Sequence, residues 1–282
     1  MSNLDAHQRQ YWAEQFDAAY HFMFEDILPY PVTECSESLV SLQEVAKNAC
    51  VEVLFSTLPH VHGLPRLFYL REGQIKGFLA AASAMNKRGW VMQVEDGFRT
   101  AEMQKYLGIM PKVFDEVLKK VMWELDGVEP TPEFMFRRCS TLVASTPKFG
   151  THMSGSAIDI SVFKRSAQTK EIDRGAPYLE VSALTPMASP FVSVEAKRNR
   201  NEINDLMHEH GFVDYPYEFW HYSSGDAYDQ FYSKTGKPAI YGAVNWNKTD
   251  NQVSPIQHPE VPLNSFEEIR IEIQAALKRI QK

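Results

Sequence analysis

The stretch KFGTHMSGSAIDISVF, residues 148–163, combines the pattern of a buried strand with two side chains that can bind a metal. Residues two apart share one face of a strand, so the aliphatic residues at every second position from Ile158 predict a face that packs in the core. Asp159 then lies on the opposite face, among small residues. His152 precedes the strand across a glycine, which lets the chain fold back so that the imidazole and the carboxylate converge.

The stretch YPYEFWHYSSGD, residues 215–226, can complete such a site. His221 would be the third protein ligand of a catalytic zinc, whose fourth position is left for water. Glu218 would be the general base that takes a proton from that water, whose pKa zinc lowers from about 15.7 to roughly 7. A spacing of three places Glu218 and His221 on opposite faces of a regular strand, so this interpretation requires a bend, which Pro216 just upstream favours.

Each of these pairs, taken alone, is also typical of a surface or core pair that holds no metal. The stretches HVH (60–62) and HEH (208–210) look like metal-binding tracts as well. The first borders a glycine turn, and the second falls in a predicted helix, where residues i and i+2 do not face each other. We interpret both as structural.

Composition and charge restrict the class of protein. Of the 282 residues, 44% are apolar and 23% charged, as in ordinary globular domains, and the net charge of −7 argues against nucleic acid or an anionic membrane as a partner. The three cysteines are widely spaced and form no CxxC pair, which predicts neither a disulfide framework nor a thiolate zinc site. No secretory signal and no apolar run of ~18 residues is visible, so the sequence predicts a cytoplasmic protein without a membrane span.

Helical and strand periodicities mix along the chain without a βαβ rhythm. They predict an α+β fold with a mostly antiparallel central sheet flanked by helices and a zinc site in a cleft on the sheet. The predicted helices cover residues 3–27, 74–89, 100–107, 112–125 and 194–211. The predicted strands cover residues 50–61, 64–73, 90–97 and 156–163, whereas we expect 164–193 to be irregular and 228–244 to form short extended pieces.

The chain is expected to form one domain over residues 1–282, with an N-terminal helical extension (about 1–48) and a C-terminal helix (about 264–282). The C-terminal helix begins with a capping box of Ser265 and Glu268. An aliphatic stripe follows at helical spacing, which favours packing on the body of the protein, with a dimer contact as the alternative. The sequence makes no prediction of the oligomeric state.

Several motifs, taken in order, resemble one family of zinc peptidases. THMSGSAID followed about sixty residues later by EFWH is similar to the pattern Ser-x-His-x-x-Gly-x-Ala-x-Asp and Glu-x-Trp-His of the D-alanyl-D-alanine dipeptidases of the vancomycin-resistance type. LREG (70–73), EDGFRT (95–100) and KPAIYGAV (237–244) look like the same family, so the resemblance spans roughly residues 50–244. These enzymes are related to the D-Ala-D-Ala carboxypeptidases and to the lysostaphin and hedgehog folds.

The resemblance implies roles for five residues. His152, Asp159 and His221 would be the ligands of one zinc ion per chain, and Glu218 would be the base. Arg99 of EDGFRT would stabilise the oxyanion of the tetrahedral intermediate, for which a permanently charged guanidinium with several fixed donors is suited.

The sequence departs from the family at the positions that hold the ammonium group of the substrate. The motif serine is Gly150 here, and the acidic residue of the family corresponds to Leu179 in RGAPYLE, with Glu180 next to it. A tyrosine of the family corresponds to Phe55. A buried ammonium without partners is strongly disfavoured, so a pocket lined by Phe55, Gly150 and Leu179 would suit a neutral or acylated group better.

Three functions follow from these residues. The first is a zinc-dependent peptidase that hydrolyses D-Ala-D-Ala or a similar small dipeptide through a metal-activated water, with Glu180 replacing the missing aspartate. The second is a zinc amidase or carboxypeptidase that acts on N-blocked or longer peptides. The third is a non-catalytic binding module that keeps the zinc. A small peptide is the expected partner in the first two.

Overall fold

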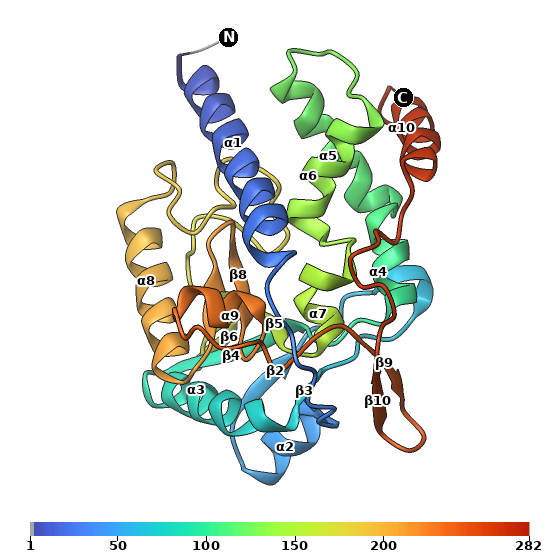
Figure 1. Ribbon diagram of the computed structural model, residues 1–282. Helices are drawn as coiled ribbons and strands as arrows, with labels where there is room; N and C mark the ends of the chain where they lie inside the picture. The colour runs from blue at the N-terminus through green and yellow to red at the C-terminus, as the bar shows by residue number, and fades with distance from the viewer. Residues whose placement is uncertain (1–2, 282) are drawn as a thin grey trace.

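A six-stranded mixed sheet forms the centre of the protein (Figure 1). The structure, a computed structural model, describes residues 3–281. The sheet runs in the order β2 (Val53–Phe55), β4 (Trp90–Asp96), β5 (Ala157–Lys164), β8 (Glu218–Ser223) and β7 (Val213–Tyr215), with β6 (Ala167–Glu171) paired to β5. Only the pairing of β2 with β4 is parallel among these strands. The α+β fold with a mostly antiparallel sheet is therefore confirmed.

One face of the sheet is the main hydrophobic core. The helices α2 (Leu42–Asn48), α3 (Ile75–Lys87) and α8 (Val194–Glu209) contribute apolar side chains to it. Alternate residues of β5, Ile158, Ile160 and Val162, are fully buried there, as the two-residue periodicity predicts. Burying such an aliphatic side chain stabilises the fold by about 1.5–3 kcal/mol. This face fixes the register of β5 and leaves Asp159 on the other side.

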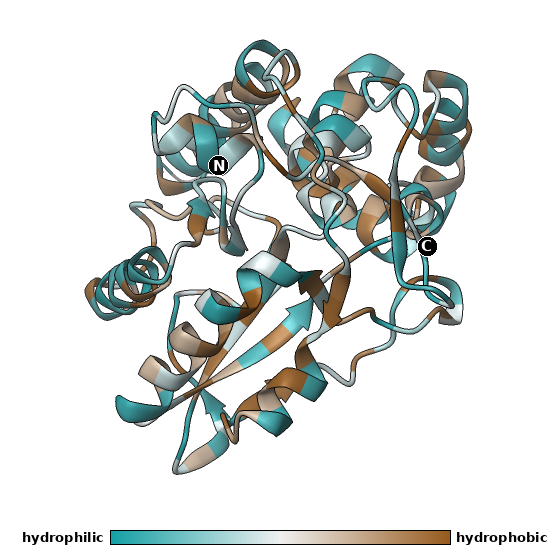
Figure 2. Ribbon diagram, turned by 60° about the horizontal axis from the view of Figure 1, so that its bottom comes forward, coloured by the Kyte–Doolittle hydropathy of each residue, from teal (hydrophilic) through white to brown (hydrophobic). Residues whose placement is uncertain are grey.

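A second group of helices lies opposite the other face of the sheet (Figure 1). It consists of α1 (Asn3–His21), α5 (Pro111–Glu124), α6 (Pro132–Val143) and α10 (Phe266–Ile280). The capping box of Ser265 and Glu268 opens α10, whose Ile269 and Ile273 are buried against α5 and α6. The C-terminal helix thus packs on the body of the protein. In Figure 2 the helices show alternating hydrophobic and hydrophilic bands, as amphipathic helices do.

Smaller elements connect the two helical groups and the sheet. Two antiparallel strand pairs lie outside the main sheet, β1 (Leu39–Ser41) with β3 (Tyr69–Arg71) and β9 (Val244–Asn247) with β10 (Gln252–Pro255). The short helices are α4 (Ala101–Gly108), α7 (Thr151–Ser154) and α9 (Ala227–Tyr232). α7 is a single turn that joins β5 through Gly155, which has a φ of 68°. This left-handed conformation reverses the chain direction, so that α7 lies next to the sheet.

Two predicted strands are wrong in length. Of the named strands, only β2 lies within 50–61 and only β3 within 64–73; β2 pairs with β4, and β3 pairs with β1. Pro59 and Pro65 lack the amide hydrogen that a ladder needs, and a short 3-10 turn lies between them.

Three further segments differ from expectation. The region 164–193 is not wholly irregular, because it contains β6. The region 228–244 is not wholly extended, because α9 begins at Ala227, where the Asp226 side chain caps the amide of Asp229. The helix α6 was not predicted, although Thr131 and Pro132 are the residue types that begin a helix.

The N-terminal extension is helical only in part. α1 continues into a π-helical turn, Phe22–Ile27, and no helix follows until α2. Residues 1, 2 and 282 of the predicted terminal segments lie outside the described residues, and the single domain stays a prediction. No helix within residues 3–281 is both long and apolar enough to cross a membrane.

We predict that Gly155→Ala lowers the free energy of unfolding more than Gly63→Ala. Both glycines have positive φ, which costs an alanine about 1–2 kcal/mol. At Gly155 the new Cβ would also lie 2.5 Å from Cδ2 of the buried Leu39, whereas nothing lies within 4 Å at Gly63. Urea unfolding followed by circular dichroism measures both variants, and equal losses would contradict the role given to the Leu39 contact.

Candidate metal centre and active site

Two carboxylate side chains and one imidazole lie next to one another on three neighbouring strands. The register pairs Asp96 of β4 with Asp159 of β5, and Asp159 with His221 of β8. They lie on the face of the sheet opposite the aliphatic residues of β5. His152 reaches the same point from α7. The antiparallel register therefore brings together residues that are far apart in the sequence.

His152, Asp159 and His221 form a buried cluster that can hold a metal ion. Each offers one ligand atom, and these atoms lie within 4.8 Å of one another. Nε2 of His152 is 3.2 Å and Nδ1 of His221 is 3.0 Å from Oδ1 of Asp159. Two imidazole nitrogens and one carboxylate oxygen are a donor set that zinc accepts, with a fourth position left open. The three side chains fit a divalent metal of this kind.

In both histidines, the ring nitrogen that faces away from Asp159 has a hydrogen-bond partner. Nδ1 of His152 donates to the carbonyl of Gly97 at 2.6 Å, and Nε2 of His221 lies 2.9 Å from Oγ1 of Thr151. Burial and the nearby Arg99 lower the pKa of His152, which favours the neutral ring. Metal-binding histidines are usually oriented in this way, with one nitrogen on a carbonyl or hydroxyl and the other on the metal.

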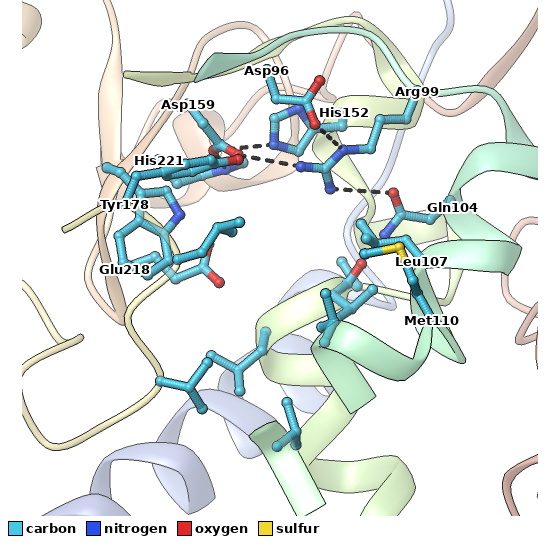
Figure 3. Close-up of a pocket in the computed structure, with 18 of the residues that line it drawn as sticks. Asp96, Arg99, Gln104, Leu107, Met110, His152, Asp159, Tyr178, Glu218 and His221 are labelled. Atoms are coloured by element: carbon cyan, nitrogen blue, oxygen red, sulfur yellow. Dashed lines mark hydrogen bonds and ion pairs between the residues drawn. The ribbon is translucent and has the colours of Figure 1, made fainter. Parts of the chain in front are cut away.

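The second oxygen of Asp159 is held by two donors (Figure 3). Oδ2 accepts hydrogen bonds from Nη2 of Arg99 at 3.2 Å and from the hydroxyl of Tyr178 at 2.9 Å. Burial alone would raise the pKa of Asp159, but His152 and His221 bring it well below its ordinary value. Asp159 is thus an anion with one oxygen turned to the histidines and the other fixed by Arg99 and Tyr178.

Arg99 is tied to its surroundings on several sides. Its Nε donates to Oδ2 of Asp96 at 2.8 Å and its Nη1 to Oε1 of Gln104 at 3.4 Å, as Figure 3 shows. Its backbone amide donates to the carbonyl of His152 at 3.1 Å. Burial opposes ionisation of Asp96, yet the adjacent Arg99 keeps the pKa of Asp96 below its ordinary value. The guanidinium therefore lies at the cluster, and its long contact with Gln104 is the weakest of its bonds.

An irregularity in β8 supplies the bend between Glu218 and His221. Asp214 pairs with Tyr222, but the next residue of β7, Tyr215, pairs with Glu218, so three residues of β8 lie between neighbouring pairs. Both Glu218 and His221 consequently line the same cavity. Burial, and secondarily the charge of Asp159, raises the pKa of Glu218 well above its ordinary value.

Two buried arginines support this bent strand and the loop before α8. The guanidinium groups of Arg174 and Arg200 lie over the ring of Phe219, 4.8 and 4.1 Å from its centre. Arg200 also donates to four backbone carbonyls, those of Arg174, Leu184, Pro186 and Met187. These bonds hold the loop that carries Tyr178, so α8 positions the phenol at Asp159 from a distance.

A cavity of about 800 Å³ contains the cluster, Arg99 and Glu218. Of the predicted substrate-binding residues, Gly150, Leu179 and Glu180 line it. Phe55 is not among the lining residues: its partly buried ring packs against Phe68, with 5.1 Å between ring centres, beside the main core.

The stretch at 60–62 does not lie wholly outside the site. His60 lines the cavity with its side chain 4% exposed, and its Nε2, 3.7 Å from Oδ2 of Asp96, has no hydrogen-bond partner among the described residues. Burial lowers the pKa of His60 to about 4. His62 instead makes an edge-to-face contact with Tyr106, and His208 bonds to Asp214 at 2.8 Å.

Several residues of the site were missed from the sequence. Tyr178, Thr151, Asp96 and Gln104 contact candidate ligands or Arg99, yet none was named as a site residue. Strand alternation could have found Asp96, because it ends a buried strand directly before a turn. Nothing in the local pattern of residues 172–193 indicates which side chain turns inward.

Comparisons with known proteins agree with the geometry. The chain matches the peptidase family M15, described as D-Ala-D-Ala dipeptidase, over residues 37–238. A D-alanyl-D-alanine dipeptidase of Synechocystis sp. is 26% identical over 251 aligned positions, covering 77% of this chain and 96% of that protein. The solved structure of the LdcB LD-carboxypeptidase is 18% identical with a TM-score of 0.38, covering 80% of this chain and 84% of that one. The buried His-Asp-His cluster is a candidate metal site. The family match covers well over half of the residues of the chain, so the chain belongs to the D-Ala-D-Ala dipeptidase family of M15 metallopeptidases.

Proposed function

We propose that the protein is a zinc-dependent peptidase that hydrolyses D-Ala-D-Ala or a similar small dipeptide, with one zinc ion held by His152, Asp159 and His221. The observation that carries the proposal is the convergence of three ligand atoms within 4.8 Å in a cavity that Glu218 also lines. Membership of the M15 family supports the reaction class, and the Synechocystis relative supports the substrate.

Glu218 is assigned the proton transfers. A zinc ion bound at the cluster supplies a water of lowered pKa and polarises the peptide carbonyl. Glu218 accepts the proton of the attacking water and later gives it to the leaving amino group. Its raised pKa suits this exchange, because the carboxyl group can hold a proton closer to neutral pH than an exposed glutamate can.

Arg99 is assigned the stabilisation of the negative charge that develops on the carbonyl oxygen. Its guanidinium lies beside Asp159, and Asp96 fixes its orientation through Nε. A fixed donor placed at a developing oxyanion is worth about 2.7–4 kcal/mol of barrier. The weak contact of Nη1 with Gln104 leaves that donor the most readily available to a substrate.

The second candidate function, cleavage of N-blocked or longer peptides, is favoured by the cavity itself. No aspartate stands at position 179, and Leu179 lines the cavity instead. Glu180 lines it too and is the carboxylate that could pair with a free ammonium. The cytoplasmic location and the absence of other partners stay predictions.

Replacing each ligand should remove the metal. We expect about one zinc per chain in the wild type and much less in His152→Ala, Asp159→Ala and His221→Ala, because three protein ligands are the minimum for a catalytic site. His208→Ala is the matched control, since that histidine pairs with Asp214 away from the cavity. Elemental analysis of purified protein gives the ratio, and wild-type zinc content in all three ligand variants would disprove the site.

Replacing the base should separate binding of the metal from catalysis. We expect Glu218→Gln to keep its zinc and to lose about 10²–10⁴-fold in kcat, because proton transfer contributes about that much. Steady-state hydrolysis of D-Ala-D-Ala and elemental analysis are measured on the same sample. Turnover near that of the wild type would reject the assignment of Glu218 as the base. A lack of hydrolysis by the zinc-loaded wild type would instead favour the zinc-binding module over an enzyme.

Removing the phenol hydroxyl should weaken the metal site without abolishing it. In Tyr178→Phe, Oδ2 of Asp159 loses one of its two donors, so we expect zinc affinity or kcat/KM to fall about 10–100-fold. Tyr106→Phe serves as the control, because Tyr106 is partly exposed and does not line the cavity. Zinc competition with a chelator measures the affinity, and an unchanged affinity and rate would show that Arg99 alone orients Asp159.

A further inference from the structure

The cavity beside the metal centre is far larger than D-Ala-D-Ala requires. Its volume of about 800 Å³ lies in the upper part of the ~300–1,000 Å³ range that encloses drug-sized ligands. A dipeptide bound at the cluster between Arg99 and Glu218 would leave most of this space to water. Such a space indicates that a substrate extends beyond the dipeptide.

The part of the cavity away from the metal ligands is apolar, and we call it the apolar arm. Its apolar side chains come from the α4–α5 junction, α5, the end of α6 and the loop before α8: Leu107, Met110, Val113, Val117, Leu142 and Val181. The charged residues Lys112, Asp115, Glu116 and Lys119 of α5 line the same cavity. Figure 3 shows Leu107 and Met110 on the cavity wall next to Gln104. Val117 is fully shielded from solvent and still lines the cavity, so the arm reaches into the helical layer.

Two exposed leucines mark the opening of this cavity. Leu58 and Leu179 line it and are 58% and 50% exposed, although leucines of this size are usually buried. Leu179 also has a φ of 65°, a conformation that costs a leucine free energy and that asparagine or aspartate adopts more readily. Contact with an apolar ligand would shield both leucines, and nothing in the described protein does so.

The charges around the cavity set the direction of the substrate. Arg66, Arg99 and the metal ligands lie at the sheet end, which is where an anionic carboxyl terminus is stabilised. The amino end of the dipeptide then faces Leu179 and Val181, where the apolar arm begins. The apolar side chains of the arm favour an uncharged group, and the carboxylates of Glu180, Asp115 and Glu116, which line the same cavity, are the alternative partners for a free ammonium.

We propose that the enzyme acts on N-acyl dipeptides of the D-Ala-D-Ala type, with the apolar acyl chain seated in the apolar arm. This inference rests on the proposed function and names its substrate class. Water adds to the carbonyl of the scissile peptide bond, the C–N bond breaks, and the proton passes through Glu218 to the leaving amine. The products are the N-acyl amino acid and a free amino acid.

A series of acyl chains tests the arm directly. We expect kcat/KM of the zinc-loaded wild type to rise about two- to fourfold for each methylene from N-acetyl- to N-octanoyl-D-Ala-D-Ala, because each is moved from water into an apolar lining. The N-octanoyl substrate should also exceed free D-Ala-D-Ala. A flat or falling series would overturn the proposal.

Variants of the arm should change the preference rather than the chemistry. Leu107→Trp narrows the arm and Leu142→Asp makes it polar, so each should lower the ratio of kcat/KM for N-octanoyl over N-acetyl substrate by tenfold or more. Val128→Trp, an exposed position outside the cavity, is the control and should keep the wild-type ratio. Two different changes are used so that a folding defect in one does not decide the result. Unchanged ratios in the folded variants would overturn the proposal.

The amino-end contact is tested at Leu179. Leu179→Asp places a carboxylate where the backbone already suits aspartate, and should shift the preference toward the free dipeptide by about 10- to 150-fold. Val261→Asp, exposed and outside the cavity, is the matched control. A wild-type preference for the free dipeptide that Glu180→Gln abolishes would overturn the proposal in favour of Glu180 as an ammonium partner.

Binding to an inactive variant separates this proposal from the proposed function. Calorimetry with zinc-loaded Glu218→Gln should show that N-octanoyl-D-Ala-D-Ala binds at least tenfold more tightly than the N-acetyl analogue. This result would support the apolar arm even if the wild type cleaved none of the dipeptides, an outcome that would reject the hydrolysis alone. Equal affinities would overturn the acyl site whatever the rates.

Discussion

The buried carboxylate of Asp159 is the interaction on which the site depends. Four side chains surround it: imidazole nitrogens of His152 and His221 lie 3.2 and 3.0 Å from Oδ1, and Arg99 and Tyr178 donate to Oδ2. They come from α7, β8, the turn after β4 and the loop before α8, so one anion ties four segments to β5. A buried charge is tolerated only when it is paired and hydrogen-bonded. Loss of any one of these side chains would therefore affect both the local fold and the orientation of a candidate metal ligand.

The same network constrains how Arg99 can act on a substrate. Its Nε and Nη2 are occupied by Asp96 and Asp159 at 2.8 and 3.2 Å, which holds the guanidinium plane in place. Such fixed orientation is what makes a donor effective at a developing oxyanion, because little reorganisation is left for the reaction step. In the proposed function Arg99 would have two tasks, orientation of the candidate ligand Asp159 and stabilisation of the oxyanion, so a kinetic effect of its replacement would include both.

The sequence predicted what depends on local periodicity and turn chemistry. The alternation around Ile158 and Ile160 correctly placed Asp159 on the face opposite the core, and the capping box at Ser265 correctly began α10. The convergence of His152, Asp159 and His221 and the bend between Glu218 and His221 could also be stated in advance. The irregular register of β8, the inward turn of Tyr178 and the core position of Phe55 could not, because they are set by Arg200, Arg174 and Phe68 packing from distant segments. The intrinsic preference of a residue for helix or strand does not depend on such contacts with distant segments, so it cannot predict them.

Packing accounts for the glycine at position 150, one of the departures from the family pattern. A Cβ at Gly150 would overlap Cε of Met153, so a serine there would require that methionine to move. Met153 is fully buried, and its neighbours leave little room for such a shift. Leu179 also lines the cavity, as an apolar residue in a backbone conformation that suits aspartate. In the proposed function, both changes remove polar groups from the wall that would face the amino end of a substrate, while Glu218, Arg99 and the three candidate ligands keep the polar groups that hydrolysis would need. The chemistry and the recognition of the amino end would then occupy separate walls of one cavity, and the second could change while the Asp159 network stays intact.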